Sequence, residues 1–290
     1  MIKTYTLNRE TWVDIDRGTA EEIGKVMDTY KVHPMVAKEL VSGTPKPRIE
    51  LEDNYIYCIL HFPTWKHTHS KDKNQEVDFI VGKNILITAR YDTIDALDKF
   101  AKEVEVKEIL AKPFVNTDGR PTQIESEFRD KNSQLNNQSP AILVGMLREL
   151  YKGISEELEY IEDRVEDITG KIFKRKEREM VVSISEMTRT LLDFKKVTDQ
   201  HGEILETLKE KGRGLFGDEF ANAMNSVISD YLKINTAIKS NLEELAELRQ
   251  TDNSLLTAKQ NETIKRLTIV GAILFILSIL VTLYLFRLNF

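Results

Sequence analysis

An apolar run near the C-terminus constrains this chain more than any other feature. Leu267 to Phe286, LTIVGAILFILSILVTLYLF, are twenty successive residues without a charged side chain. At about 1.5 Å of rise per residue, a helix of this length spans about 30 Å, the hydrocarbon thickness of a bilayer. A buried core helix is the alternative, but such a helix normally carries a polar stripe. The run therefore predicts one transmembrane helix.

The flanking charges predict the orientation of that helix. Lys259, Lys265 and Arg266 precede the run, and only Arg287 follows it. Under the positive-inside rule the N-terminal side then lies in the cytoplasm. The N-terminus has no apolar core of signal-peptide length. We expect a single-pass protein of the cell (inner) membrane that contacts membrane lipid, with its large N-terminal part inside the cell.

The first third of the chain mixes strand and helix patterns. Ile49–Phe62 and Glu76–Arg90 are rich in β-branched and aromatic residues, which predicts strands, with a hairpin turn at Gly82–Asn84. Two segments with helical spacing follow Thr19 and Thr93, which are plausible N-caps. The pattern is that of a domain built from both helices and strands.

Long helices dominate from Ala141 onward. Apolar residues recur at spacings of three and four on the first of them, at Leu147, Leu150, Ile154, Leu158, Ile161, Val165, Ile168 and Ile172. Its other face is acidic, which indicates either a solvated surface or an attractor for cations. A second helix carries Met180 to Phe194 and continues until KGRGLFG (Lys211–Gly217) interrupts it. A third begins near Asp218 with no later proline, so one helix of roughly 100 Å can continue through the membrane.

The expected fold class is an α+β N-terminal cytoplasmic domain, a long helical coiled-coil stalk and a C-terminal transmembrane helix. The expected boundaries are 1–111 for the α/β domain, 112–139 for a polar linker or insertion, 140–266 for the stalk, 267–286 for the span and 287–290 for a short outer tail.

The motifs argue against an enzyme. GRGLFG (Gly212–Gly217) matches a dinucleotide-binding pattern, but it lies between two long helices without the required strand, so it predicts a helix-hairpin turn. No phosphate-binding loop, zinc-protease motif or catalytic triad order is present. The formal net charge of −6 also excludes the basic character usual in nucleic-acid binders.

Three stretches together resemble the CorA family of magnesium channels. They are HPMVAKELVSGTPKPRIELEDNYIYCILHFP from His33, EVDFIVGKNILITARYDTIDALDKF from Glu76, and QNETIKRLTIVGAIL from Gln260. The resemblance covers nearly the whole chain except the polar insertion. It implies a funnel-shaped homo-oligomer, a pentamer, in which one transmembrane helix of each subunit lines a passive pathway for Mg²⁺ or other divalent cations.

The resemblance also assigns pathway residues. Asn261 aligns with a polar pore ring, Ile264, Leu267 and Phe275 align with apolar gate positions, and Ser278 aligns with a small polar one. Each is equally compatible with ordinary packing in a membrane. Glu39 and Asp230 align with acidic positions that would bind regulatory Mg²⁺ between subunits, or they are two surface carboxylates.

The pore mouth departs from the family pattern. The family places Tyr-Gly-Met-Asn after this span and then a second transmembrane helix. Here one alignment puts Arg287 at the asparagine, and another keeps Asn289 but puts Arg287 at the glycine. We expect either a natural single-span relative with an impaired mouth or a truncated sequence. The alternatives to a conducting channel are a non-conducting metal-sensing or regulatory homologue, and a dimeric single-span signalling or tethering protein.

Overall fold

The computed structural model describes residues 1–7, 10–44, 46–64, 74–111, 139–171 and 177–288. The chain forms two compact units. The first consists of Met1–Glu162 with Arg189–Ser240, and the second consists of Asp163–Thr188 with Asn241–Phe290. Apart from Ser139, the predicted linker 112–139 lies outside the described residues.

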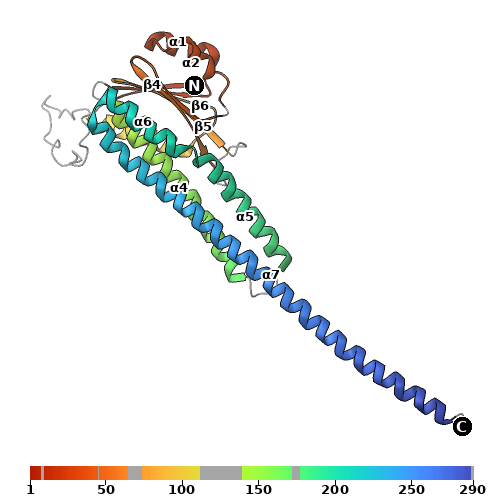
Figure 1. Ribbon diagram of the computed structural model, residues 1–290. Helices are drawn as coiled ribbons and strands as arrows, with labels where there is room; N and C mark the ends of the chain where they lie inside the picture. The colour runs from red at the N-terminus through yellow and green to blue at the C-terminus, as the bar shows by residue number, and fades with distance from the viewer. Residues whose placement is uncertain (8–9, 45, 65–73, 112–138, 172–176, 289–290) are drawn as a thin grey trace, which may run out of the picture. The chain divides into compact units, whose positions relative to one another are not determined.

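A six-stranded mixed sheet forms the centre of the first unit (Figure 1). Its order is β1-β2-β6-β5-β4-β3, and only the β2–β6 pair is parallel. The strands are β1 (Ile2–Leu7), β2 (Glu10–Asp16), β3 (Arg48–Leu51), β4 (Tyr55–Pro63), β5 (Asn74–Gly82) and β6 (Ile85–Arg90). A mostly antiparallel sheet with helices on its faces confirms the predicted α+β class.

Two short helices cover one face of the sheet, α1 (Ala20–Tyr30) and α2 (Pro34–Glu39). The predicted cap at Thr19 is confirmed, because its hydroxyl accepts from the Glu22 N–H at 3.3 Å while the Glu22 carboxylate accepts the Thr19 N–H at 2.9 Å. Ile23 and Met27 of α1 are buried in one cluster with side chains from the sheet. The capping box therefore fixes where the helix starts, and the apolar cluster fixes the face that it buries.

The longer helices cover the opposite face. They are α3 (Asp95–Ala111), α4 (Ser139–Lys171) and α6 (His201–Phe216), while α5 (Glu177–Thr198) precedes α6. The first part of α7 (Asp218–Leu288) packs against α4 and α6. Trp12 of β2 packs 5.6 Å from the ring of Phe100 on α3. Phe62 of β4 packs 6.0 Å from Tyr151 on α4 and 5.4 Å from His201 on α6. Aromatic side chains therefore carry much of the contact between sheet and helices.

A buried ionic group joins the sheet to α3. The Arg90 guanidinium donates to Asp14 at 3.0 Å and to Asp98 at 2.7 Å. Thr88 donates to Asp14 at 2.9 Å and accepts the Trp12 indole N–H at the same distance. Burial raises the pKa of the Asp14 carboxyl, and the Arg90 charge opposes that rise. Asp14 thus depends on Arg90 for its charge.

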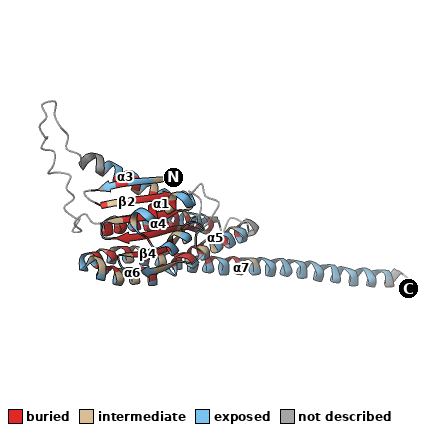
Figure 2. Cartoon of the chain, turned by 90° about the horizontal axis from the view of Figure 1, so that it is seen from above, coloured by how far each residue is buried: buried red, intermediate tan, exposed pale blue. Residues whose placement is uncertain are grey.

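The apolar stripe predicted on the first long helix is confirmed. Its members from Leu147 to Ile168 are all buried, whereas Ile172 lies outside the described residues. Figure 2 shows the contrast between the buried sheet and the exposed C-terminal part of α7. In the second unit Ile184, Leu245 and Leu248 are buried, so α5 and α7 each bury an apolar side there.

Three predictions of local structure were wrong in detail, and one hairpin was missed. The N-terminal hairpin of β1 and β2 was not predicted. The predicted strand Ile49–Phe62 is two antiparallel strands separated by Glu52–Asn54, where polar residues favour a turn. The cap of α3 is Ile94 instead of Thr93, because the Ile94 carbonyl accepts the Asp98 N–H. The second long helix is α5 and α6, broken at Asp199–Gln200.

The glycine-rich turn is shorter than predicted. Gly212 and Gly214 lie inside α6, and only Gly217, with φ at +92°, leaves the helix. A left-handed φ favours glycine, so the chain turns at this residue and α7 begins at Asp218. A βα dinucleotide loop is therefore absent from this part of the described chain.

Candidate functional site

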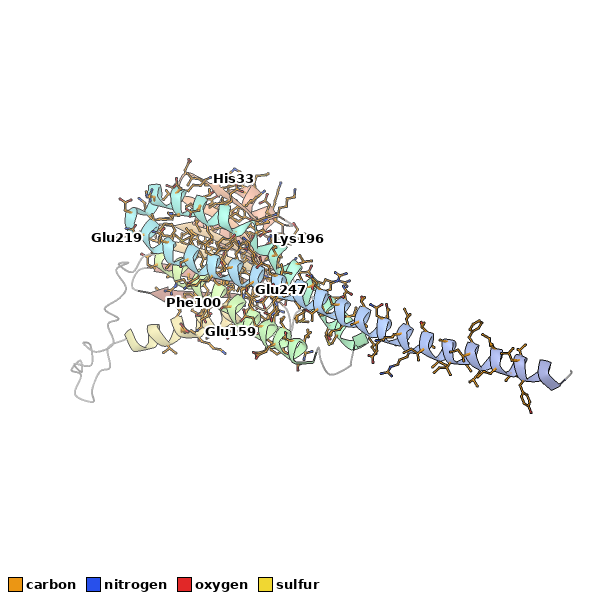
Figure 3. The ribbon with its side chains drawn as sticks, turned by 60° about the horizontal axis from the view of Figure 1, so that its bottom comes forward. His33, Phe100, Glu159, Lys196, Glu219 and Glu247 are labelled. Atoms are coloured by element: carbon orange, nitrogen blue, oxygen red, sulfur yellow. The ribbon has the colours of Figure 1, made fainter. Side chains whose placement is uncertain are left out.

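The C-terminal half of α7 is the candidate site. Within the described part of the chain it is the one helix long and apolar enough to cross a membrane, judged by length and composition. Every described side chain from Thr257 to Leu285 is exposed (Figure 3). Thr268 and Thr282 donate their hydroxyls to carbonyls four residues earlier, and Ser278 donates to the Phe275 carbonyl. These bonds satisfy the hydroxyls inside the helix, which makes them tolerable in a bilayer.

The predicted pathway residues share one side of this helix. At about 100° per residue, the five positions fall within an arc of about 120°. They are Asn261, Ile264, Leu267, Phe275 and Ser278, all of them exposed. The structure therefore places them where a neighbouring helix or an axial pathway can contact them together. Their role in a pathway remains a prediction.

The same side of α7 carries a polar groove before the apolar span. This shallow, open groove is lined by Ala246, Arg249, Gln250, Asn253, Ser254, Thr257, Ala258 and Asn261. Apart from the guanidinium of Arg249, these side chains are small or carry a neutral amide or hydroxyl, and there is no carboxylate among them. Amide and hydroxyl oxygens suit a cation that keeps its water shell, as Mg²⁺ does in most protein sites. Asn261 closes the groove and begins the predicted pathway.

The predicted pore mouth is only partly described. Arg287 is helical at the end of α7, and Asn289 lies outside the described residues. The side chain of Arg287 is also outside the description. The predicted roles of both residues therefore stay predictions.

The two predicted regulatory carboxylates each pair with an arginine of the same chain. Glu39, at the end of α2, forms an ion pair with Arg48 of β3. Asp230, on α7, pairs with Arg148 of α4 at 3.2 Å and with Lys233 at 3.4 Å. Among the residues that the structure describes, no three or more His, Cys, Asp or Glu side chains gather as metal ligands. A metal at either carboxylate would have to compete with these cations.

Sequence reasoning missed a buried polar layer beneath α2. Asp78, in the middle of β5, is 1% exposed and its Oδ2 lies 2.8 Å from the Tyr91 hydroxyl. Glu76 lies 3.4 Å from His61 and accepts the Thr44 N–H. Burial, and next the nearby Glu76 charge, raise the pKa of Asp78 to about 8. One sequence signal existed: Asp78 interrupts the otherwise apolar segment VDFIVG.

A second missed group connects the sheet to α4 and α6. His201 is fully buried, with Nδ1 2.8 Å from the Tyr151 hydroxyl and Nε2 2.7 Å from the His61 carbonyl. A neutral imidazole satisfies both contacts, because Nε2–H donates to the carbonyl and Nδ1 accepts from the hydroxyl. Burial lowers the pKa of His201 to about 4.

Comparison with known proteins places this architecture in a family. A profile of the CorA-like Mg²⁺ transporter protein family matches residues 8–284. The chain is 19% identical over 275 residues to the cobalt/magnesium transport protein CorA of Thermotoga maritima, covering 94% of this chain and 72% of that one. It is 21% identical over 265 residues to the protein of that name from Methanocaldococcus jannaschii, covering 91% and 76%.

Solved structures show the same fold. The CorA magnesium transporter of Methanocaldococcus jannaschii superposes with a TM-score of 0.70 at 21% identity, covering 90% of this chain and 75% of that one. The full-length CmaX protein superposes with a TM-score of 0.69 at 12% identity, covering 91% and 74%. The combination of an α+β domain with a long, partly apolar C-terminal helix is therefore common to this chain and these structures.

Proposed function

We propose, because the chain belongs to the family of CorA-like Mg²⁺ transporter proteins, that it carries Mg²⁺ or another divalent cation passively across the cell (inner) membrane. The first 266 residues would lie in the cytoplasm. One observation carries the proposal: the polar groove of α7 and the predicted pathway residues lie on the same side of one helix.

A single helix cannot enclose a pathway, so the proposal requires several copies. We expect a homo-oligomer, and the resemblance favours a pentamer in which the polar groove faces the axis. Asn261 would then form a ring of amide oxygens at the inner end, and Ser278 a ring of hydroxyls deeper in the membrane. The mass of the complex in mild detergent tests this arrangement. A monodisperse monomer or dimer with an intact span would contradict it.

Cysteine accessibility tests which side of α7 faces water. The one native cysteine, Cys58, is buried, so its background labelling should be low. We expect a charged thiol reagent to label Ser278→Cys in liposomes. The matched control is Ile276→Cys, about 160° around the helix, which should resist labelling because it faces lipid. Equal labelling of the two positions, or labelling of Ile276→Cys alone, would contradict the proposed pathway.

The mouth is proposed to limit the flux. At about 8 Å and an effective dielectric constant of ~20, a dication and one guanidinium repel each other by roughly 4 kcal/mol. A ring of inward-facing Arg287 side chains would therefore oppose entry strongly, even with screening. Arg287 at a helix end can instead reach outward to lipid phosphates, which leaves Asn289 free to line the mouth. The first arrangement favours the non-conducting alternative.

Glu39 and Asp230 are proposed as regulatory Mg²⁺ ligands contributed by neighbouring subunits. Their arginine partners should weaken the affinity for Mg²⁺, because the ion must displace a guanidinium from each carboxylate. We expect millimolar Mg²⁺ to protect the wild-type chain from protease, and Glu39→Gln with Asp230→Asn to abolish that protection. Equal protection with and without Mg²⁺, or protection that survives the double substitution, would remove this role.

A further inference from the structure

Asp78 lies at a point where the sheet meets the end of α2. It pairs across the sheet with Ile59 of β4 and Ala89 of β6, and both belong to the cluster that packs against α2. Leu40, the C-cap residue of α2, is buried in that cluster. The carbonyl of Leu40 is one of the helix-end acceptors that need a donor from elsewhere in the chain.

The hydroxyl of Tyr91 contacts both groups. Its oxygen lies 2.8 Å from Asp78 Oδ2 and 3.1 Å from the Leu40 carbonyl oxygen. A tyrosine hydroxyl has one hydrogen, and a carbonyl can only accept. Both hydrogen bonds form at once only if Tyr91 donates to Leu40 while a protonated Asp78 donates to Tyr91. Two full hydrogen bonds at the Tyr91 oxygen therefore favour a proton on Asp78.

The charged surroundings also favour that proton. Glu76 is two residues away on the same face of β5, Glu39 lies on α2, and Arg48 on β3 is the opposing cation. Tyr57 and His61 of β4 complete the titratable groups around the layer, and the Asp78 Oδ1 atom has no hydrogen-bond partner in the described part of the chain. A buried carboxylate beside two others is costly, because neither solvent nor enough positive charge compensates it.

We propose that the protonation state of Asp78 controls whether the segment from Leu40 to Thr44 is held on the sheet, and we call this arrangement a proton-operated latch. With the proton bound, the Asp78–Tyr91–Leu40 chain holds the end of α2 on the sheet. When the proton leaves, the Tyr91 hydrogen turns to the carboxylate and the Leu40 carbonyl loses its donor. The new charge also repels Glu76, which holds the Thr44 N–H at 2.7 and 2.8 Å through its two oxygens. The segment therefore loosens as pH rises.

This latch is a regulatory device that does not depend on the proposed transport function. Its position, however, makes the order of the loop that follows α2 depend on pH. Because burial raises the pKa of Asp78 to about 8, the change falls in the slightly alkaline range. Proton loss should open the segment, while acid should hold it closed.

Hydrogen exchange of the full-length chain in detergent tests the latch directly. We expect amide exchange at Leu40–Thr44, corrected for its intrinsic pH dependence, to rise about tenfold from about pH 6.5 to about pH 9.5, the scale of one lost buried hydrogen bond. Asp78→Asn should abolish the rise, because its amide donates to Tyr91 at every pH. Asp53→Asn, in the exposed turn before β4, is the matched control and should behave as wild type.

Two further results keep the test decisive. Tyr91→Phe removes the donor to Leu40 and should raise exchange of the segment already at about pH 6.5. Infrared absorption of a protonated carboxyl should be present in wild type at neutral pH, fade by about pH 9.5, and be absent in Asp78→Asn. The proposal is overturned if wild type and Asp78→Asn exchange alike across this range, or if Tyr91→Phe leaves the segment fully protected.

Discussion

The neutral state of His201 should make the first unit sensitive to mild acid. Its ring lies 5.4 Å from Phe62 and 5.8 Å from Tyr151, and no part of it is exposed. Protonation would place a charge in this aromatic cluster and leave Nδ1 unable to accept from Tyr151. Burial is the largest cause of the low pKa, and the His61 carbonyl opposes it by accepting from the ring.

The size of the effect follows from the two pKa values. The folded-state pKa is about 4 against an ordinary value of 6.5, so the unfolded chain binds the proton first as pH falls. Neutral His201 therefore contributes its full stabilisation of the folded state above about pH 6.5, and this contribution is lost as pH falls through about 4. Each pKa unit corresponds to ~1.4 kcal/mol, so the free energy of unfolding should fall by about 3 kcal/mol.

Urea unfolding of the detergent-solubilised chain, followed by the fluorescence of buried Trp12, measures this loss. His201→Gln keeps a donor toward the His61 carbonyl but does not titrate, so its stability should change less with pH. The matched control is His33→Asn, because His33 is exposed and asparagine can also accept the Met35 N–H at the start of α2. Parallel pH dependence of wild type and His201→Gln between about pH 7 and about pH 4 would refute the reasoning.

Three further sets of substitutions test the packing of α6, the buried Arg90–Asp14 ion pair and the protonation of Asp78. Gly212→Ala should lower the free energy of unfolding by about 1–3 kcal/mol, because the added Cβ would lie 2.1 Å from Cε1 of Phe220. Gly214→Ala in the same helix meets no atom within 4 Å and should stabilise the helix. Thermal unfolding of the two variants measures the difference. Arg90→Met should cost about 3–5 kcal/mol by leaving Asp14 uncompensated, and adding Asp14→Leu should recover much of that loss in urea titrations. Asp78→Asn should be more stable than wild type, by a margin that grows from about pH 4 to about pH 8. The reason is that a raised carboxyl pKa stabilises the folded wild type in acid, and this stabilisation is lost as pH rises. Equal stability of the two proteins across this range would contradict a raised pKa at Asp78.

The sequence predicted the elements that follow from local patterns. The apolar run Leu267–Phe286 is long enough to predict a span without knowledge of any partner, and the structure makes it part of one helix that is long and apolar enough to cross a membrane. The spacing from Leu147 to Ile168 predicted the buried face of α4, because helix periodicity alone sets which side chains share a face. Thr19 was predicted as a cap because it precedes a segment with helical spacing, and the structure adds that Glu22 completes a capping box.

The missed features depend on distant residues. His201 bonds residues 50 and 140 positions away in the chain, and sequence periodicity does not encode such pairings. Asp78 meets Tyr91 and Leu40 only because sheet register and the packing of α2 bring them together. The roles proposed for Asn261, Ser278, Glu39 and Asp230 came from resemblance, and each would depend on neighbouring copies of the chain.

Divalent-cation flux tests the central claim most directly. Full-length chain would be reconstituted in liposomes that contain a Mg²⁺-sensitive dye, with protein-free liposomes as the baseline. The account predicts low flux for wild type, higher flux for Arg287→Gly, and block of that flux by thiol modification of Arg287→Gly combined with Ser278→Cys. No flux above baseline in Arg287→Gly would contradict conduction along α7 and favour the non-conducting regulatory alternative. Strong wild-type flux that Arg287→Gly leaves unchanged would show that Arg287 does not limit entry.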